Sequence, residues 1–436
     1  MRPGAGTARH PIITGALALV VAGGVLGCAP PGDEGITLRF WAFGREGEVV
    51  AEMVPEFERT HPGIRVVVQQ MPWTAAHEKL LTAHVGRTTP DVAQLGNTWI
   101  PEFAALEALA PLDSFVDASP LVDSAAYFGG IWVTNRNEGR LLGVPWYVDT
   151  RVLFYRSDLL ARAGYAAMPA SWAEWRRAME AVKARGGPGT FAIYLPTNEW
   201  NPPILLGVGA GSTLLADDWQ HGAFREAPFR RAFDFYLGLY RDGLAPAMGA
   251  NDVANLYQEF ARGTFAMYLG GPWQLGEFAR RLPPELQDKW ATAPLPSEDG
   301  REPGRSLAGG SSLVVFAATK HRDAAWQLVE YLAQPAQQVA FFRLSGNLPA
   351  RREAWADSAL AGDPRVQAFR VQLDHVAPMP PIPEWELITS RVIEQAERAV
   401  RGGVPADAVL ATLDGQVDQV LEKRRWLLAR ARVERP

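Results

Sequence analysis

Hydrophobic and polar residues alternate along the chain in a pattern that predicts short strands separated by amphipathic helices. Residues 36–41 are a short apolar run, and an amphipathic segment covers residues 48–60. The valine-rich segment 64–70 predicts a second strand, and residues 74–85 have helical periodicity. A buried strand is predicted at residues 91–95, and a helix at residues 99–109. This order predicts an α/β fold with a mainly parallel sheet flanked by helices.

The same pattern continues through the rest of the chain. Residues 171–174 (Ser-Trp-Ala-Glu) form a capping box that predicts the start of a helix. Strands are predicted at residues 190–195, 264–269 and 312–318, and the chain from Trp385 onward is mostly helical in pattern. A chain of 436 residues is too long for one typical core, so we expect two lobes and at least two sheets.

The N-terminus has the pattern of a secretion signal. A basic start precedes an uncharged apolar run over residues 11–27, and Cys28 is the only cysteine of the chain. The segment resembles the signal of bacterial lipoproteins, with Leu26 departing from it. We therefore expect a lipoprotein signal peptide over residues 1–28 with a lipid anchor at Cys28, and a tether over residues 29–35. The alternative is an ordinary cleaved signal and a free cysteine.

Composition narrows the class of partner. The net charge is −5 and no basic cluster occurs, which argues against a nucleic acid partner. The chain contains 15 tryptophans, and because a buried indole N–H needs a partner, several of them are expected to face a ligand.

Enzyme and metal motifs are missing from the sequence. His77-Glu78 begins like a zinc-protease helix but lacks the second histidine, and the 7 histidines are scattered. We expect no metal, no cofactor and no catalysis. Because a carboxylate pair for glycoside cleavage is set by distance in space, a surface-anchored carbohydrate-active enzyme stays an alternative.

Six segments together carry a resemblance to a known family. They are residues 38–41 (Leu-Arg-Phe-Trp), 57–66 (helix end, His-Pro-Gly turn and strand), 90–99, 143–158, 270–273 (Gly-Gly-Pro-Trp) and 308–313. In this order they resemble the extracellular solute-binding proteins of sugar ABC transporters, the group that includes maltose-binding protein.

The resemblance implies a two-lobed periplasmic-binding-protein-like fold, with a hinge and a central ligand cleft that closes on the solute. Residues 36–147 and 304–350 would form the first lobe, and residues 148–303 and 351–436 the second. The implied function is that of an extracytoplasmic, periplasmic or cell-surface receptor. It would be a monomer, anchored to the membrane through Cys28, that binds a mono- or oligosaccharide and delivers it to ABC transporter permease subunits.

A sugar site needs flat aromatic surfaces for the C–H face of a pyranose and planar polar groups for neighbouring hydroxyls. The loops that the resemblance places at the cleft supply both kinds. The candidate ligand-binding residues are Gly44, Arg45, Glu46, Asn97, Thr98, Trp99, Tyr147, Asp149, Glu199, Trp200, Asn201, Trp273, Gly310, Ser311 and Trp385.

Several of these residues also have a structural interpretation. Trp273 and Trp385 match stacking positions of the family but could pack under the cleft, and Asp149 could pair with Arg151. Trp73 is expected at the lobe rim, and Trp41, Trp172, Trp175 and Trp326 are expected in the core.

A second alternative keeps the fold but changes the ligand. A non-sugar solute such as a polyamine would need aromatic rings around a cation and acidic residues close together. This alternative is favoured if Asp149 and Glu199 stand together, and the sugar interpretation if they stand apart along a ring.

Overall fold

The computed structural model describes residues 35–434, and Ile36–Pro436 forms one compact unit. The predicted signal peptide, Cys28 and all but the last residue of the tether lie outside the described residues. Three clusters of buried apolar side chains lie entirely within this unit, so residues 36–436 carry their own hydrophobic core. Among the described residues, no helix has the length and apolar character needed to cross a membrane.

The first of two main sheets has six strands in the order β15-β6-β14-β3-β1-β2. β1 pairs in parallel with both β2 and β3, whereas β14 runs antiparallel to β3 and β6. The strands are β1 (Ile36–Phe43), β2 (Ile64–Met71), β3 (Val92–Gly96), β6 (Val144–Asp149), β14 (Gly309–Val315) and β15 (Leu348–Pro349).

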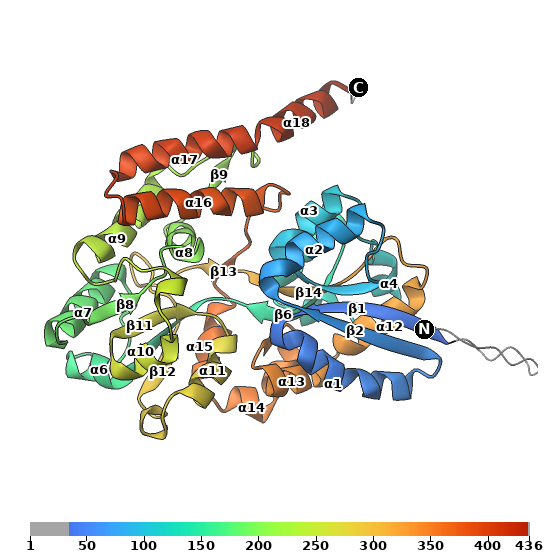
Figure 1. The fold of residues 1–436 in the computed structure, drawn as a ribbon, viewed down its shortest axis with the longest axis horizontal. Helices are drawn as coiled ribbons and strands as arrows, with labels where there is room; N and C mark the ends of the chain where they lie inside the picture. Colours follow the sequence, from blue (N-terminus) through green and yellow to red (C-terminus); the bar gives the residue numbers. More distant parts are fainter. Residues whose placement is uncertain (1–34, 435–436) are drawn as a thin grey trace, which may run out of the picture. The chain divides into compact units, whose positions relative to one another are not determined.

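Helices cover both faces of this sheet because successive strand residues point to opposite sides. Leu38 and Phe40 of β1 pack with α1 (Gly44–Thr60), α12 (Arg322–Leu332) and α13 (Pro335–Ser345). Phe43 points to the other face, toward α2 (Trp73–Val85) and α3 (Ile100–Ala105). We call the six-stranded sheet with these helices the first lobe (Figure 1).

The second sheet has four strands in the order β12-β7-β11-β8, and we call it, with its helices, the second lobe. Its strands are β7 (Val152–Arg156), β8 (Phe191–Tyr194), β11 (Phe265–Gly270) and β12 (Trp290–Ala293). One apolar cluster joins it to α7 (Trp172–Arg185), α8 (Asn201–Gly209), α9 (Ala227–Arg241), α16 (Trp385–Val400) and α17 (Ala406–Val420). The opposite face packs on α10 (Leu256–Arg262), α11 (Trp273–Arg281) and α15 (Pro364–Gln372).

The chain passes between the two sheets through short extended segments. Thr150 and Arg151 join β6 to β7, and β13 (Ser306–Leu307) pairs with β16 (Val376–Ala377) just before β14. Figure 1 shows these segments between the two groups of strands. β7 and β14 each begin at a connecting segment, so they run away from that segment. β1 and β3 run toward the connecting segments.

This entry direction corrects the prediction of a mainly parallel sheet. β14 pairs antiparallel with both neighbours in the first sheet, and β7 does the same in the second. Both sheets are therefore mixed, although the α/β class and the two separate sheets agree with the sequence.

The predicted helix over residues 99–109 is also shorter than expected. It is a 3-10 turn, η1 (Asn97–Trp99), followed by α3, which ends at Ala105 because Glu107 takes a left-handed φ of 53°. Of the capping box predicted at residues 171–174, the N-cap half is present, since Ser171 Oγ accepts a hydrogen bond from the Glu174 backbone at 3.3 Å, whereas the Glu174 side chain binds Arg177.

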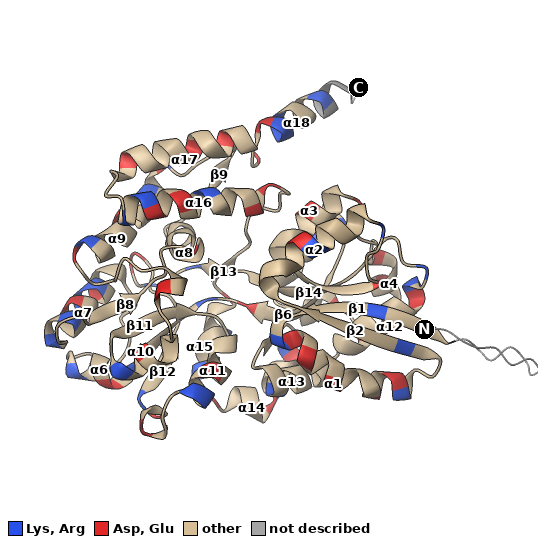
Figure 2. Cartoon of the chain, in the orientation of Figure 1, with Lys and Arg blue, Asp and Glu red and all other residues tan. Residues whose placement is uncertain are grey.

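The remaining elements are short or peripheral. They are α4 (Asp113–Ala118), α5 (Gly129–Trp132), α6 (Ser157–Arg162), α14 (Ser358–Ala361), α18 (Glu422–Glu434), β4 (Arg136–Asn137), β5 (Arg140–Leu141), β9 (Leu215–Ala216) and β10 (His221–Gly222), with η2–η6 at Ser124–Ala126, Val133–Asn135, Ala250–Asp252, Pro284–Leu286 and Arg352–Ala356. Charged residues gather on helices and loops, while the strands are mostly uncharged (Figure 2).

Candidate functional site

The predicted loops of the first lobe meet at one edge of its sheet. β1 ends just before Gly44, β3 ends just before Asn97, and β6 ends at Asp149. The register of β14 aligns Gly309 with Asp149 and Ser311 with Gly96. Strand order and register therefore bring together residues that are far apart in the sequence.

Glu46 is the centre of a buried hydrogen-bond network at this edge. Its side chain accepts from Asn347 Nδ2 at 3.0 Å, from the Tyr147 hydroxyl at 3.2 Å and from Trp73 Nε1 at 3.4 Å. Burial raises the pKa of Glu46 above its ordinary value, and the three donors oppose that rise. The Glu46 carboxyl therefore holds three segments of the chain together at this edge of the sheet.

Gln94 connects the same network to β14. Its Oε1 accepts from the Phe43 backbone at 2.8 Å, and its Nε2 donates to the Tyr147 hydroxyl at 2.9 Å and to Ser311 Oγ at 3.3 Å. Ser311 is 1% exposed, so in this conformation its hydroxyl bonds within the network and does not face solvent. Gly310 has a φ of 150°, and a Cβ there would collide with the Tyr147 carbonyl oxygen, so only glycine fits.

An aromatic cluster lies beside this network. Trp73 packs edge-on to Phe43 at 5.1 Å and to Trp99 at 5.7 Å between ring centroids, and Trp99 lies 5.0 Å from His77. Trp73 remains 36% exposed, so part of its ring is open to solvent, and its expected position at the lobe rim stays a prediction. Arg45 turns away from Glu46 and donates to the Leu344 carbonyl oxygen at 3.1 Å.

Two contacts join this edge to other parts of the chain. Asn97 Nδ2 donates to the Ala308 carbonyl oxygen at 2.7 Å, which ties the loop after β3 to a connecting segment. Thr98 Oγ1 donates to Glu386 of α16 at 2.8 Å. Burial raises the pKa of Glu386, while Thr98 and His77 oppose the rise. The Thr98–Glu386 bond thus links the first lobe to a helix of the second.

Where the chain passes from β6 to β7, Asp149 at the end of β6, Arg151 and Trp273 of α11 form a stack. Arg151 Nε and Nη2 donate to the two oxygens of Asp149 at 3.1 and 3.3 Å. The guanidinium carbon lies 4.7 Å from the centroid of the Trp273 ring. Burial raises the pKa of Glu199, nearby Asp149 adds to the rise, and Arg151 opposes it. Arg151 therefore binds Asp149 directly and also acts on the charge of Glu199.

Trp200, Asn201 and Trp385 form the remaining group. Trp200 meets Trp385 edge to face at 6.0 Å, and Trp385 is fully buried in the core of the second lobe. Among the described residues, Asn201 Oδ1 and Trp385 Nε1 have no hydrogen-bond partner. Trp385 offers no exposed face in this conformation, and its predicted stacking role stays a prediction.

Sequence reasoning missed four residues of this arrangement. Gln94 lies inside a buried strand, and Asn347 lies between a helix and a strand, so neither stood out. Glu386 directly follows the predicted Trp385, and that position was the available signal. Arg151 was considered only as a partner of Asp149. Trp172, Trp175 and Trp326 are buried as expected, while Trp41 is only partly buried.

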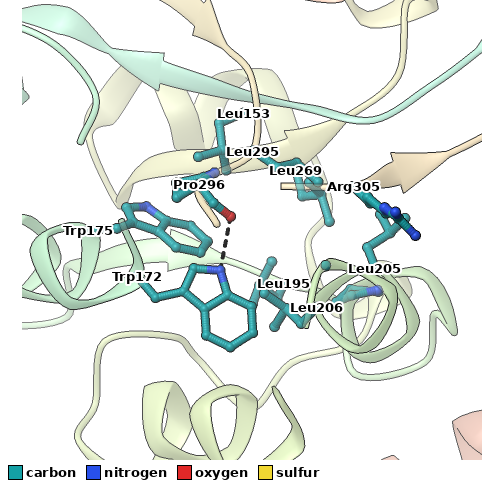
Figure 3. A pocket seen from close by; sticks show the side chains of 12 residues that line it. Leu153, Trp172, Trp175, Leu195, Leu205, Leu206, Leu269, Leu295, Pro296 and Arg305 are labelled. Carbon is teal, nitrogen blue, oxygen red and sulfur yellow. Dashed lines mark hydrogen bonds between the residues drawn. The ribbon is translucent and has the colours of Figure 1, made fainter. Parts of the chain in front are cut away.

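A separate apolar pocket lies in the second lobe between the sheet, α7 and α8 (Figure 3). Leucines of β7 and β11 line it with Trp172 and Trp175, and none of the predicted ligand residues does. Its cavity volume of about 20 Å³ has room for one water-sized group. Trp172 Nε1 already donates to the Pro296 carbonyl oxygen at 2.9 Å, so we interpret the pocket as a packing gap.

Within residues 35–434, no group of three or more His, Cys, Asp or Glu side chains is placed to hold a metal ion. The polar groups of the site form hydrogen-bond networks and one charged stack. This arrangement is suited to binding a solute through hydrogen bonds and ring contacts.

Comparison with known proteins agrees with this geometry. Residues 44–339 match the family model described as bacterial extracellular solute-binding protein. The structure of the sugar-binding protein MalE from Xanthomonas citri superposes with a TM-score of 0.86 at 48% identity, covering 90% of this chain and 99% of that chain.

Two curated relatives are more distant. The diacetylchitobiose binding protein DasA of Streptomyces coelicolor is 24% identical over 90% of this chain and 92% of its own length. An uncharacterized lipoprotein of Streptomyces antibioticus is 29% identical over 77% of this chain and 75% of its own. The prediction of a non-enzymatic receptor with two separate lobes is confirmed by the family and the shared fold. The chain belongs to the bacterial extracellular solute-binding protein family.

Proposed function

We propose that this protein is an extracytoplasmic receptor of an ABC importer that binds a mono- or oligosaccharide between its lobes and presents it to the permease. The names of its relatives support the sugar class, since they include a sugar-binding protein and a diacetylchitobiose binding protein. A further solved relative, the GacH receptor of Streptomyces glaucescens, is described in complex with acarbose.

The side chains that the two lobes offer to a ligand support the same class of ligand. The first lobe offers the exposed edge of Trp73 and the indole of Trp99 beside the Glu46 network. The second lobe offers Trp273, Trp200 and the carboxyl of Glu199. Aromatic faces next to charged acceptors suit a pyranose, whose hydroxyls donate to carboxylates while its C–H face packs on a ring.

The connecting segments support closure of one lobe on the other. The β6–β7 connection and the β13–β16 pair are short, extended and lie next to Asp149. We take them as the hinge between a first lobe of residues 36–147 and 304–350 and a second lobe of residues 148–303 and 351–436. Ligand that contacts both lobes would stabilise the closed form.

We also propose that Cys28 carries a lipid anchor and that residues 29–35 tether the receptor to the membrane. One relative is named a lipoprotein, which supports a lipid anchor on this chain. Mass spectrometry of the mature N-terminus tests it. A diacylated or triacylated Cys28 is the expected result, and an unmodified N-terminus beyond residue 28 would contradict the anchor.

The observation that carries the sugar proposal is the meeting of Glu46, Trp73 and Trp99 with Thr98 and Glu386 where the two lobes touch. The test is thermal unfolding of residues 36–436 with a panel of mono-, di- and trisaccharides, with polyamines alongside. A sugar that raises the midpoint in a saturable way supports the proposal through ligand linkage. No response to any sugar, with a response to an amine, would overturn it.

Trp273 allows a sharper test with a single variant. Trp273→Ala should weaken binding of the responding sugar by about 1–3 kcal/mol, the scale of one lost aromatic contact. Isothermal titration measures the change, and Trp326→Phe is the control because Trp326 packs on Phe115 away from the predicted ligand residues. Unchanged affinity for every bound sugar would remove Trp273 from the site.

A further inference from the structure

The stack of Asp149, Arg151 and Trp273 has the parts of a binding site for an organic cation. Such a site places a positive group over an aromatic face and close to carboxylates. Here the aromatic face is Trp273, and the carboxylates are Asp149 and Glu199. The chain itself supplies the cation, since the Arg151 guanidinium lies 4.7 Å from the ring centroid.

Arg151 is held firmly in this place. Its side chain is 12% exposed and binds both oxygens of Asp149, whose side chain is 21% exposed. Its backbone N–H donates to Ser306 Oγ at 2.9 Å, which fixes the residue to β13. Although burial opposes the charged form, Asp149 and Glu199 keep the pKa of Arg151 above its ordinary value.

Arg151 supplies the positive charge that faces the acidic groups around the stack. Asp149, Glu199 and Tyr268 are the groups that interact electrostatically with the guanidinium. A ligand ammonium at the same ring would meet a like charge and would find the Asp149 oxygens already occupied. A neutral polyol meets no such repulsion and can still use the carboxyl of Glu199.

We propose that Arg151 is a specificity residue that fills the cation position at Trp273 with the protein's own guanidinium, so that the site excludes cationic solutes and accepts neutral ones. The proposal rests on the proposed function in placing Trp273 in the ligand wall. It also gives the acidic groups Asp149 and Glu199 a cation of the chain itself, where without Arg151 they would favour a polyamine.

The first test replaces the charge but keeps the bulk of the side chain. Arg151→Met in residues 36–436 is titrated with putrescine, spermidine and methylguanidine, and the unfolding midpoint and affinity are measured. Wild type should show no saturable response to these amines. The variant should bind at least one of them about tenfold or more tightly than wild type, because the ring and two carboxylates are then free.

The chain offers a matched control in Arg156, at the other end of β7. Arg156 also binds an aspartate two residues away, with both distances to Asp158 at 2.8 Å, and its side chain is 6% exposed. Its remaining donors bind the carbonyl oxygens of Phe260 and Ala261. Arg156→Met should lose stability without gaining affinity for any amine, which separates specificity from structural support.

Two further variants keep the test decisive. Arg151→Lys retains a cation and should still exclude the amines. If Arg151→Met does not fold, Arg151→Gln takes its place, and methylguanidine should raise the midpoint of that variant by replacing the lost group. Amine binding by wild type, or no amine response in either neutral variant, overturns the proposal.

The outcome is distinguishable from failure of the proposed function. If no sugar stabilises wild type but Arg151→Met gains amine binding, Arg151 still acts as a cation filter and the sugar class is wrong. If a sugar stabilises wild type and the neutral variants gain nothing, the sugar class stands and the role of Arg151 is wrong.

Discussion

The two lobes build their sides of the site in different ways. On the first lobe, Glu46 and Gln94 join the strand ends through five side-chain hydrogen bonds to Trp73, Tyr147, Asn347 and Ser311. Toward the second lobe, the guanidinium of Arg151 in the β6–β7 connection joins Asp149, at the end of β6, to the Trp273 ring of α11. The first arrangement is a hydrogen-bond network around one buried carboxyl, and the second is an ion pair stacked on a ring next to the connecting segment.

This difference suggests that the first-lobe network fixes the geometry of the site and that the charged stack selects the ligand by its charge. A network with most partners internal to one lobe keeps its geometry whether or not the other lobe closes. A charged stack responds to any charge that enters, because charge interactions act over a longer range than hydrogen bonds. We therefore expect first-lobe changes to alter stability and second-lobe changes to alter which solute binds.

The largest expected effect is on stability, from Glu46→Leu. The change removes the acceptor of two buried donors, the Tyr147 hydroxyl and the Asn347 amide, and should lower the free energy of unfolding by about 2–4 kcal/mol. Urea unfolding of residues 36–436 measures it. Glu46→Gln retains an acceptor and should lose much less, so equal losses in the two variants would show that the network has little weight.

A smaller effect is expected from pH. Burial raises the pKa of Glu46, Glu199 and Glu386 above the ordinary value of 4.5, so the folded protein holds more protons than the unfolded chain above about pH 4.5. His77 acts in the same direction, because Glu102 raises its pKa above 6.5. Stability should therefore rise as the pH falls from about 8 to about 5.

The pH comparison also tells the lobes apart. Glu46→Gln should reduce the gain in stability on acidification that comes from the first lobe. Glu199→Gln should reduce the part that comes from the second lobe. Thermal unfolding across this pH range measures both. A midpoint that falls steadily on acidification, with no change in either variant, would contradict the buried, uncharged tendency of these carboxyls.

The smallest expected effect concerns the contact between the lobes. Thr98→Ala removes the 2.8 Å bond to Glu386, which is worth about 1 kcal/mol at a partly exposed site. A double-mutant cycle with Glu386→Ala, which removes the acceptor, isolates the pair. Thr134→Ala is the control, because Thr134 bonds only within the first lobe. A coupling near zero would mean that Thr98 and Glu386 do not hold the lobes together.

Much of the fold could be predicted because each strand is a short apolar run and each helix carries a buried stripe. β1, β2 and β11 begin within a residue of the predicted positions. Strand direction could not be predicted, since it depends on which segments pass between the sheets. The loops that follow β1 and β3 meet as expected, because parallel strands end at the same edge of a sheet.

The hydrogen-bond and stacking partners within the site could not be predicted from the sequence. Asn347 and Glu46 are separated by 301 positions, and nothing local marks either as the other's partner. The stacking of Arg151 on Trp273 depends on where α11 begins relative to β7. The depth of Trp385 depends on α8 and α16 together, which sequence periodicity does not reveal.

The position of β14 also has a consequence for synthesis of the chain. β14 lies between β6 and β3, yet it begins at Gly309, about 160 residues after β6 ends at Asp149. At roughly 5–20 residues per second, β3 and β6 wait about 10–30 s on the ribosome with a strand edge open to other chains. The sheet of the first lobe is thus completed late, at β15, although its N-terminal strands are made first. During this interval the sheet of the first lobe cannot reach its native strand order, because its central strand has not yet been made.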